Sequence, residues 1–405
     1  LLALAAVALA TLGADALLTR HKRNQGEFYA LLLWSASGLM LMVKGNDLLV
    51  VFLGLELMSI ALYVLATWYR ELPEAAEAGM KYFLMGALAS TFFLYGIATV
   101  YGRLGSTRLT ALKGSLAGGE GFSDPMLQVG LLAIVAALAF KIALVPFHSW
   151  APDVYQGMTT PAVAFLSTAP KAAAVVVAVK VLATLAPSGL GEPWRPLLSV
   201  LAILSILFGN VVALAQRDLK RMLAYSGIAQ MGYVAIGLAT FDGPAFEGIL
   251  VFLAGYLATN IAAFLAVAAL SNGETEPHPL ADLAGMGRQR PFAASVLTLA
   301  MLSLTGLPPT VGFIGKLLVF RAAIDAGLMT LALVGIFGSL VSAGYYLRVV
   351  YTLWMKEPSR EVAAPEEDVL SGAAYILVAA AMLVLGVLPR PLLDLARAAI
   401  QSLPH

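Results

Sequence analysis

The chain has 405 residues, of which 60% are hydrophobic and only 12% are charged, and its net charge is +1. A soluble domain carries about twice this share of charged residues, and the mean hydropathy of this chain is +0.86. The balanced charge argues against a nucleic-acid-binding protein. The sequence contains no cysteine, which excludes disulfides and cysteine-ligated iron–sulfur or zinc sites in this chain.

Long apolar segments with almost no charge are typical of transmembrane helices. Because these runs are continuous rather than short and alternating, they predict an all-α polytopic membrane protein and not a β-barrel. We predict about twelve transmembrane helices. In chain order their ranges are 1–18, 28–43, 47–68, 79–102, 126–149, 160–185, 196–216, 221–241, 245–270, 292–325, 328–353 and 370–390.

The predicted spans indicate an internal repeat. We divide the chain into an N-terminal helix with a cytoplasmic loop (1–27), a first five-helix repeat (28–185), a second five-helix repeat (196–353), and a loop with a C-terminal helix (354–405). The fourth span of each repeat contains a lysine beside a helix break, Lys141 in the first and Lys316 in the second. Since each repeat has an odd number of spans, we expect the two repeats to be inverted in the membrane, as in many ion-coupled transporters.

The segment 137–157, ALAFKIALVPFHSWAPDVYQG, places a lysine inside a span that a proline interrupts. A lysine near the middle of a span is unfavourable by ~2.5–3.5 kcal/mol on insertion scales, so it is seldom retained for structure alone. Pro146 has no N–H and displaces the carbonyl of Ile142, which then needs water or another polar partner. The segment therefore indicates a hydrated, ion-handling interior.

The tenth predicted span, 292–325, is too long for one straight crossing. It contains Gly306, Pro308, Pro309, Gly312 and Gly315, all before Lys316. We therefore expect two half-helices that are joined by an unwound stretch near the middle of the membrane.

Four ionisable residues lie far from any predicted loop: Glu56, Lys141, Lys171 and Lys316. Buried charges usually mark ion pathways in membrane proteins, and a nearby glutamate holds a buried lysine in its charged form until it moves away. These four residues therefore predict a proton relay. The alternative is a set of structural salt bridges that fix helix register. Because Pro170 directly precedes Lys171, we expect a kink in that helix as well.

Three residues are secondary candidates for the relay: His148, Lys180 and Tyr225. The unperturbed pKa of histidine near 6.5 suits proton shuttling, whereas Lys180 is also close enough to its helix end to reach the interface. Four basic residues at span ends are interpreted as interfacial anchors: Lys81, Arg217, Lys220 and Arg221. We predict no metal and no cofactor in this chain, because the other histidines lie in loops or at the terminus.

The loops that contain Arg20, Lys22, Arg23, Arg217 and Arg221 belong to the more basic set, which is expected to face the cytoplasm. We expect a multi-pass protein of the cell inner (plasma) membrane.

Seven segments carry a resemblance to a known family. They are GEFYALLL (26–33), FLGLELMSIALY (52–63), MKYFLMGALASTFFLYG (80–96), FKIALVPFHSWAPDVYQG (140–157), FLSTAPKAA (165–173), KRMLAYSGIAQMGY (220–233) and SLTGLPPTVGFIGK (303–316). In family order, they resemble the antiporter-like membrane subunits of respiratory complex I, and within these the subunit N group of bacterial NADH-quinone oxidoreductases. Lysine rather than glutamate at position 316 favours this group.

The resemblance implies a proton-translocating subunit in which Glu56, Lys141, Lys171 and Lys316 form a hydrated polar axis, and Glu56 and Lys141 form the gating pair. It implies enzyme activity only as part of the whole oxidoreductase. Flavin, iron–sulfur clusters and quinone are then expected in partner subunits, and the expected partners are a neighbouring antiporter-like subunit, small membrane subunits and lipids. Two alternatives stay open: a subunit of a multi-subunit sodium/proton antiporter, and a non-pumping structural subunit of the same complex.

Overall fold

The computed structural model describes residues 4–11, 25–116, 124–185, 191–271, 279–358 and 369–401. Within these ranges the chain is helical and forms no β-strand, which confirms the all-α prediction. A short helix covers residues 4–11. The helices that follow are α2 (Gln25–Lys44), α3 (Leu48–Ala66), α4 (Pro73–Leu104), α5 (Leu109–Leu116), α6 (Pro125–Ile142), α7 (Trp150–Gly157), α8 (Thr160–Leu166), α9 (Ala169–Leu185), α10 (Gly191–Ala215), α11 (Leu219–Leu238), α12 (Gly243–Ala269), α13 (Met286–Gln289), α14 (Pro291–Thr305), α15 (Val311–Asp325), α16 (Met329–Met355), α17 (Val369–Val387) and α18 (Arg390–Gln401).

Eight helical segments of the described chain are long and apolar enough to cross a membrane, or nine if the bent pair α17–α18 is one span. The helix α11 and the interrupted pair α14–α15 fall outside this set, although both match predicted spans. The predicted span 1–18 overlaps the helix at 4–11 and otherwise lies outside the described residues. The membrane class is thus confirmed, while the number twelve and the division into two inverted repeats stay predictions.

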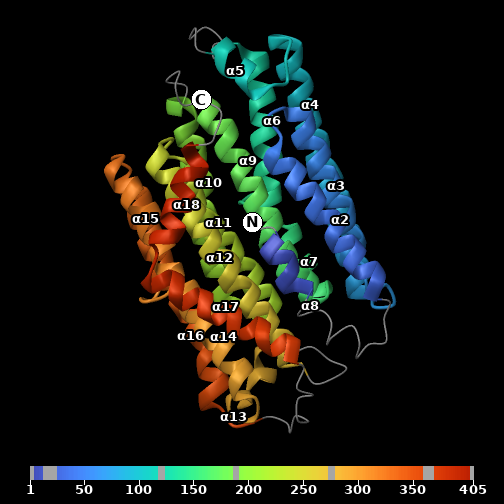
Figure 1. The fold of residues 1–405 in the computed structure, drawn as a ribbon, viewed down its shortest axis with the longest axis vertical. Coiled ribbons are helices and arrows are strands. Elements are labelled where there is room, and N and C mark those ends of the chain that lie inside the picture. Colours follow the sequence, from blue (N-terminus) through green and yellow to red (C-terminus); the bar gives the residue numbers. More distant parts are fainter. Residues whose placement is uncertain are drawn as a thin grey trace.

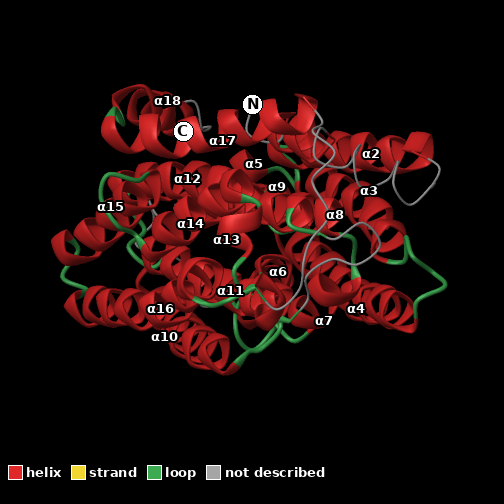
Figure 2. Ribbon diagram, turned by 90° about the horizontal axis from the view of Figure 1, so that it is seen from below, coloured by secondary structure: helices red, strands yellow, loops and turns green. Residues whose placement is uncertain are grey.

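The helices lie side by side in one bundle, as Figure 1 shows. The N-terminal helices α2, α3 and α4 form one side of it, and α14, α15 and α16 form the other. The view in Figure 2 shows α10 and α16 along one edge and α17 and α18 along the opposite edge, with α12 and α14 between them. The helix α12 therefore lies inside the bundle, whereas α10, from the middle of the chain, lies at its edge.

The hairpin of α2 and α3 illustrates how the apolar helices pack. A side chain at Gly38 would meet the backbone of Met58, and one at Gly54 would meet the backbone of Met42. Glycines at both positions allow the two backbones to touch, which is the usual way for helices to associate where lipid removes the hydrophobic driving force. This contact fixes α3, the helix that contains Glu56.

Two helices are interrupted where the sequence predicts breaks. The helix α6 ends at Ile142, Ala143 adopts a left-handed backbone conformation (φ 60°), and α7 begins at Trp150. The helix α14 ends at Thr305, and α15 begins at Val311. Gly306 caps α14 with φ 89°, a conformation that glycine adopts without steric cost. The predicted half-helices around residues 306–310 are confirmed.

A third interruption separates α8 from α9 at Ser167 and Thr168, just before Pro170 and Lys171. Thr160–Thr184 still forms one span, so the kink stays a prediction. Pro170 lies in the first turn of α9, where its missing N–H leaves no hydrogen bond unmade. The combined segment Thr160–Thr184 is 94% buried, as is α12, whereas Pro73–Leu104 is 44% buried. Lys171 thus lies on a central helix that is surrounded by other helices.

The last helix turns away from the bundle axis. The helices α17 and α18 meet at an angle of 83°. The Nε atom of Arg397 on α18 lies 3.6 Å from Oε2 of Glu247 on α12. The C-terminal helix is thereby attached across the end of the central helix α12.

Candidate functional site

The first two predicted relay residues are Glu56 on α3 and Lys141 on α6. Among the described residues, no ion pair within 4 Å joins them. The Nζ atom of Lys141 instead donates a hydrogen bond of 2.7 Å to Ser59 Oγ, and the hydroxyl of Ser90 donates to Glu56 Oε1. The side chain of Lys141 is 5% exposed. The acid and the base thus each have a serine hydroxyl as a neutral partner.

Aromatic rings complete the surroundings of Lys141. Its Nζ atom lies 5.7 Å from the ring centroids of both Tyr63 and Phe140. A ring face near a desolvated ammonium stabilises its charge. The carbonyl of Phe140 accepts a hydrogen bond of 3.0 Å from Trp150 Nε1, so α7 is bound to the last turn of α6.

Lys171 has the least satisfied ammonium group of the three predicted relay lysines. It is 1% exposed, and its Nζ atom has no hydrogen-bond partner in the described protein. The ring of Tyr155 lies 5.4 Å from this atom, and a side chain at Gly227 would lie 3.3 Å from it. Because an amino group buried without a hydrogen bond is strongly unfavourable, this position favours a water molecule or a transferable proton.

Polar side chains of α11, α12 and α16 lie between Lys171 and Lys316. A side chain at Gly227 would also lie 3.1 Å from Tyr256 Oη, which accepts a hydrogen bond of 3.1 Å from Asn260. On the neighbouring turn, Gln230 Nε2 donates to the carbonyl of Leu304 at 3.0 Å and lies 3.3 Å from Tyr346 Oη. These groups form a buried polar layer inside an otherwise apolar bundle.

Lys316 is bound to the end of the interrupted helix α14. Its Nζ atom donates to the carbonyls of Leu304 at 2.8 Å and Thr305 at 3.0 Å, and it lies 4.8 Å from the ring centroid of Tyr233. Carbonyls at a helix C-terminus lack intrahelical partners and carry partial negative charge, so they suit an ammonium group. The carbonyl of Leu304 is shared with Gln230, which connects Lys316 to the polar layer.

A small cavity of about 10 Å³ opens beside Lys316. Its lining includes the side chains of Gln230, Tyr256, Thr259 and Ser303. A space of about 10–15 Å³ with several polar partners is sufficient for one water molecule. The cavity therefore suits a proton-carrying water between the polar layer and Lys316.

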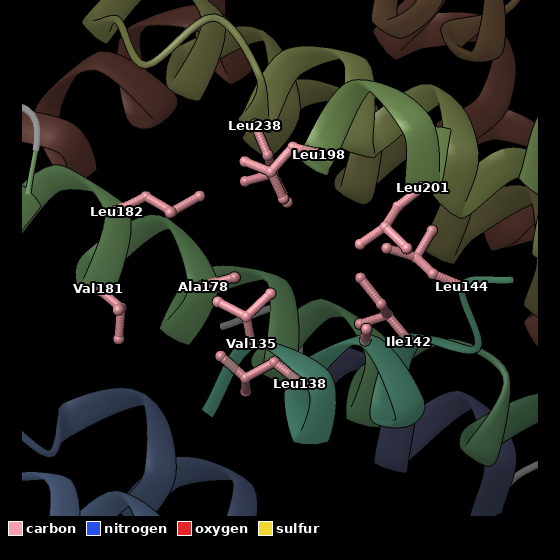
Figure 3. Close-up of a pocket in the computed structure, with 11 residues that line it drawn as sticks. Val135, Leu138, Ile142, Leu144, Ala178, Val181, Leu182, Leu198, Leu201 and Leu238 are labelled. Atoms are coloured by element: carbon pink, nitrogen blue, oxygen red, sulfur yellow. The ribbon is translucent and has the colours of Figure 1, made fainter. Parts of the chain in front are cut away.

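A second cavity, of about 30 Å³, has no polar side chain in its lining, as Figure 3 shows. Its lining comes from α6, the break after it, α9, α10 and α11: Val135, Leu138, Ala139, Ile142, Leu144, Ala178, Val181, Leu182, Leu198, Leu201 and Leu238. Because every lining side chain is aliphatic, this cavity is not suited to hold water or a proton carrier.

Among the secondary candidates, Lys180 has a clear structural partner. Its Nζ atom donates to the carbonyls of Val43 at 2.9 Å and Gly45 at 2.8 Å, so it caps the C-terminal end of α2. It is 7% exposed, so most of its surface is covered by protein.

The structure places His148 and Tyr225 around a common neighbour. The ring of His148 is half-buried and lies 4.7 Å from that of Phe208, which in turn lies 6.2 Å from the ring of Tyr225. In the part of the chain that the structure describes, no group of three or more histidine, aspartate or glutamate side chains is placed to bind a metal ion.

One further lysine, Lys220, is buried in the protein. We interpreted Lys220 as an interfacial anchor because it is next to a predicted loop, but it is 1% exposed, and its Nζ atom donates to the carbonyl of Met158 at 3.0 Å. The segment after α7 covers it, and hydropathy along α11 alone contains no sign of that cover. Lys220 is therefore a buried lysine in addition to the predicted ones.

The interrupted helices and the buried charges between them define the chain as a polytopic, antiporter-like membrane protein. The family described as NADH:quinone oxidoreductase/Mrp antiporter, transmembrane, matches residues 45–342, a range that includes all four predicted relay residues. The chain belongs to this family.

Individual relatives agree with this assignment. The chain is 41% identical to NADH-quinone oxidoreductase subunit N of Trichlorobacter lovleyi over 98% of its own length and 82% of that protein. It matches a chain of respiratory complex I from Thermus thermophilus, solved with bound aureothin, at 38% identity and a TM-score of 0.79, covering 97% of this chain and 85% of that one. A chain of the Mrp complex from Dietzia, at 23% identity, has a TM-score of 0.86 over 99% and 83% of the two chains and shares the fold. The resemblance to the subunit N group is confirmed.

Proposed function

We propose that the chain translocates protons as an antiporter-like membrane-arm subunit of an NADH:quinone oxidoreductase, in a bacterial inner membrane. The observation that carries this proposal is the row of buried amino groups, Lys141, Lys171 and Lys316, each beside a helix interruption. The 41% identity to a protein named as subunit N supports the choice of complex.

In this proposal Glu56 and Lys141 form the switch. While the hydroxyl of Ser90 binds Glu56 and Lys141 binds Ser59, the two charges are separated. Direct contact between them would stabilise the ammonium form of Lys141, and separation in a water-poor interior favours release of its proton. A proton released there passes to Lys171, whose Nζ atom has no hydrogen-bond partner among the described residues.

The second half of the path runs from Lys171 to Lys316. The polar layer of Tyr256, Gln230 and Tyr346, together with the water-sized cavity beside Lys316, supplies groups that accept and donate protons between them. This chain would hold no flavin, iron–sulfur cluster or quinone, and redox chemistry in partner subunits would drive the switch through electrostatic and conformational change.

A subunit of a sodium/proton antiporter is the second candidate, because the Mrp complex shares the fold. The two candidate functions are distinguished by an experiment. The protein is purified in mild detergent, the co-purifying subunits are identified, and the absorbance is scanned for flavin and iron–sulfur centres. Redox centres and about a dozen partners support the proposed function. A colourless preparation with a few small membrane partners would overturn it in favour of the antiporter.

A further inference from the structure

The short helix α7 (Trp150–Gly157) is the connection between two of the proposed relay lysines. It follows the break after α6 and precedes α8, and it is a separate helix from both. Trp150 at its start donates to the carbonyl of Phe140, the residue before Lys141. Tyr155 near its end lies with its ring 5.4 Å from Lys171 Nζ. The position of α7 thus sets the surroundings of both lysines.

One carboxylate attaches α7 to two other helices. Asp153 Oδ2 lies 2.6 Å from Lys81 Nζ of α4, and its Oδ1 lies 2.6 Å from a terminal guanidinium nitrogen of Arg221 of α11. Gln156, one turn later, accepts from the same nitrogen of Arg221 at 2.9 Å. Both oxygens of Asp153 are used, each for a different helix, and the side chains of Asp153 and Arg221 are 28% and 27% exposed.

The geometry points to Asp153 as a positioning residue of the relay: by binding Lys81 and Arg221 together, it fixes α7 so that Trp150 and Tyr155 keep the surroundings of Lys141 and Lys171. This inference rests on the proposed function, since it assigns Asp153 a task only if these lysines transfer protons. Asp153 itself touches neither lysine among the described contacts, so it acts through the helix and not as a carrier.

Loss of the Asp153 carboxylate would leave two positive charges without the negative charge that they share. Without its charge, Lys81 and Arg221 would face each other across a neutral side chain, and removal of one partner from a half-buried ionic group is more damaging than removal of an exposed one. A small displacement of a group that surrounds a reacting centre is enough to slow transfer strongly.

Glu77 offers a matched control for this test. It also lies 2.6 Å from Lys81 Nζ, but on the same helix, α4, and its side chain is 63% exposed. Glu77→Gln removes the same charge from the same lysine as Asp153→Asn without releasing α7. Asp153→Glu keeps the negative charge on a side chain that is longer by one methylene group.

The experiment compares Asp153→Asn, Asp153→Glu, Glu77→Gln and Lys141→Ala in the whole complex. Protons pumped and quinone reduced are measured per assembled complex, and hydrogen exchange is measured for peptides that cover residues 150–157. For Asp153→Asn we expect about tenfold slower pumping, a lower ratio of protons to quinone, and faster exchange in these peptides. We expect Asp153→Glu to restore most of the activity and Glu77→Gln to behave as the unchanged protein.

The outcomes separate this inference from the proposed function. If Lys141→Ala abolishes pumping while Asp153→Asn lowers only the amount of complex, with the rate and proton ratio per complex unchanged, Asp153 is merely structural and the inference fails while the function stands. If assembled Lys141→Ala pumps normally, the proposed function itself fails. Equal losses in Asp153→Asn and Glu77→Gln would also overturn the inference, because the effect would then belong to Lys81 alone.

Discussion

Lys141 of α6 donates a hydrogen bond of 2.7 Å to Ser59 of α3. It does not donate to Glu56, which precedes Ser59 by three residues on α3. Glu56 in turn accepts from Ser90 of α4. The structure thus represents an arrangement in which the acid and the base have separate neutral partners. In the proposed switch, direct contact of Glu56 with Lys141 in place of the two serines would be the second state.

Lys141→Ala should remove the central base of the relay. We expect proton pumping and coupled quinone reduction to fall by at least about tenfold, while the complex still assembles, because alanine fits an apolar interior. Pumping in membrane vesicles, normalised to the amount of assembled complex, checks this. Full coupled activity in an assembled variant would refute the relay.

Glu56→Gln keeps the size of the side chain and the acceptor for Ser90 but removes the charge that Lys141 needs. We expect a loss of pumping similar to that of Lys141→Ala. Ser90→Ala is the informative companion, because it removes the hydroxyl partner and leaves the carboxylate in place. If Glu56→Gln were as active as the unchanged protein, the glutamate would not be part of the switch.

Gly227→Ala tests the surroundings of Lys171. The added methyl group would lie 3.3 Å from Lys171 Nζ and 3.1 Å from Tyr256 Oη, so it would occupy the space that a water or proton carrier needs. We expect about tenfold slower pumping with normal assembly. Gly372→Ala in α17 is the control, since a side chain there meets nothing within 4 Å. Equal activity in the two variants would contradict a transfer site beside Gly227.

Lys180→Ala should lower the stability of the complex, with little or no effect on proton pumping per assembled complex. The substitution leaves the carbonyls of Val43 and Gly45 without their charged donor, and a hydrogen bond to a charged group contributes about 1.5–3 kcal/mol. We expect a lower temperature of complex dissociation. A large loss of pumping at normal stability would instead return Lys180 to the relay.

The attachment of α7 should resist mild acid. Although partial burial is the largest influence and raises the pKa of Asp153, hydrogen bonds from Lys81 and Arg221 lower it below its ordinary value of 3.8. Because the unfolded chain then binds the proton more readily, the stabilisation is complete above about pH 4 and is lost only as the pH falls through the lowered pKa. Hydrogen exchange of residues 150–157, corrected for intrinsic rates, should therefore stay constant from pH 7 to about 4. Loosening that begins near pH 6 would disagree with this.

The sequence predicts the helix interruptions well because their causes are local. Pro146, Gly306 and Pro308 change the backbone wherever they occur, so the breaks after Ile142 and Thr305 follow from residue types alone. The burial of Lys141, Lys171 and Lys316 also follows, since long apolar runs surround each of them in the sequence.

The partners of these charges could not be predicted, because they come from distant parts of the chain. Lys180 finds carbonyls at the end of α2, and Lys220 finds that of Met158, which is 62 positions earlier. Hydropathy reports the distance of a residue from a loop but not which segment folds over it. For the same reason the sequence did not reveal that Asp153 joins α4, α7 and α11.

The burial of the two central segments, Thr160–Thr184 and α12, has a consequence for how the membrane influences the protein. In the apolar stretch of each, 94% of the residues are buried, so lipid tails reach Lys171 and Asn260 only through an outer ring of helices. Changes in bilayer thickness or lipid type would first tilt the outer helices, such as α4, and would alter the centre only as far as those helices transmit the movement. The fold thereby separates the polar interior from the chemical variety of the lipids around it.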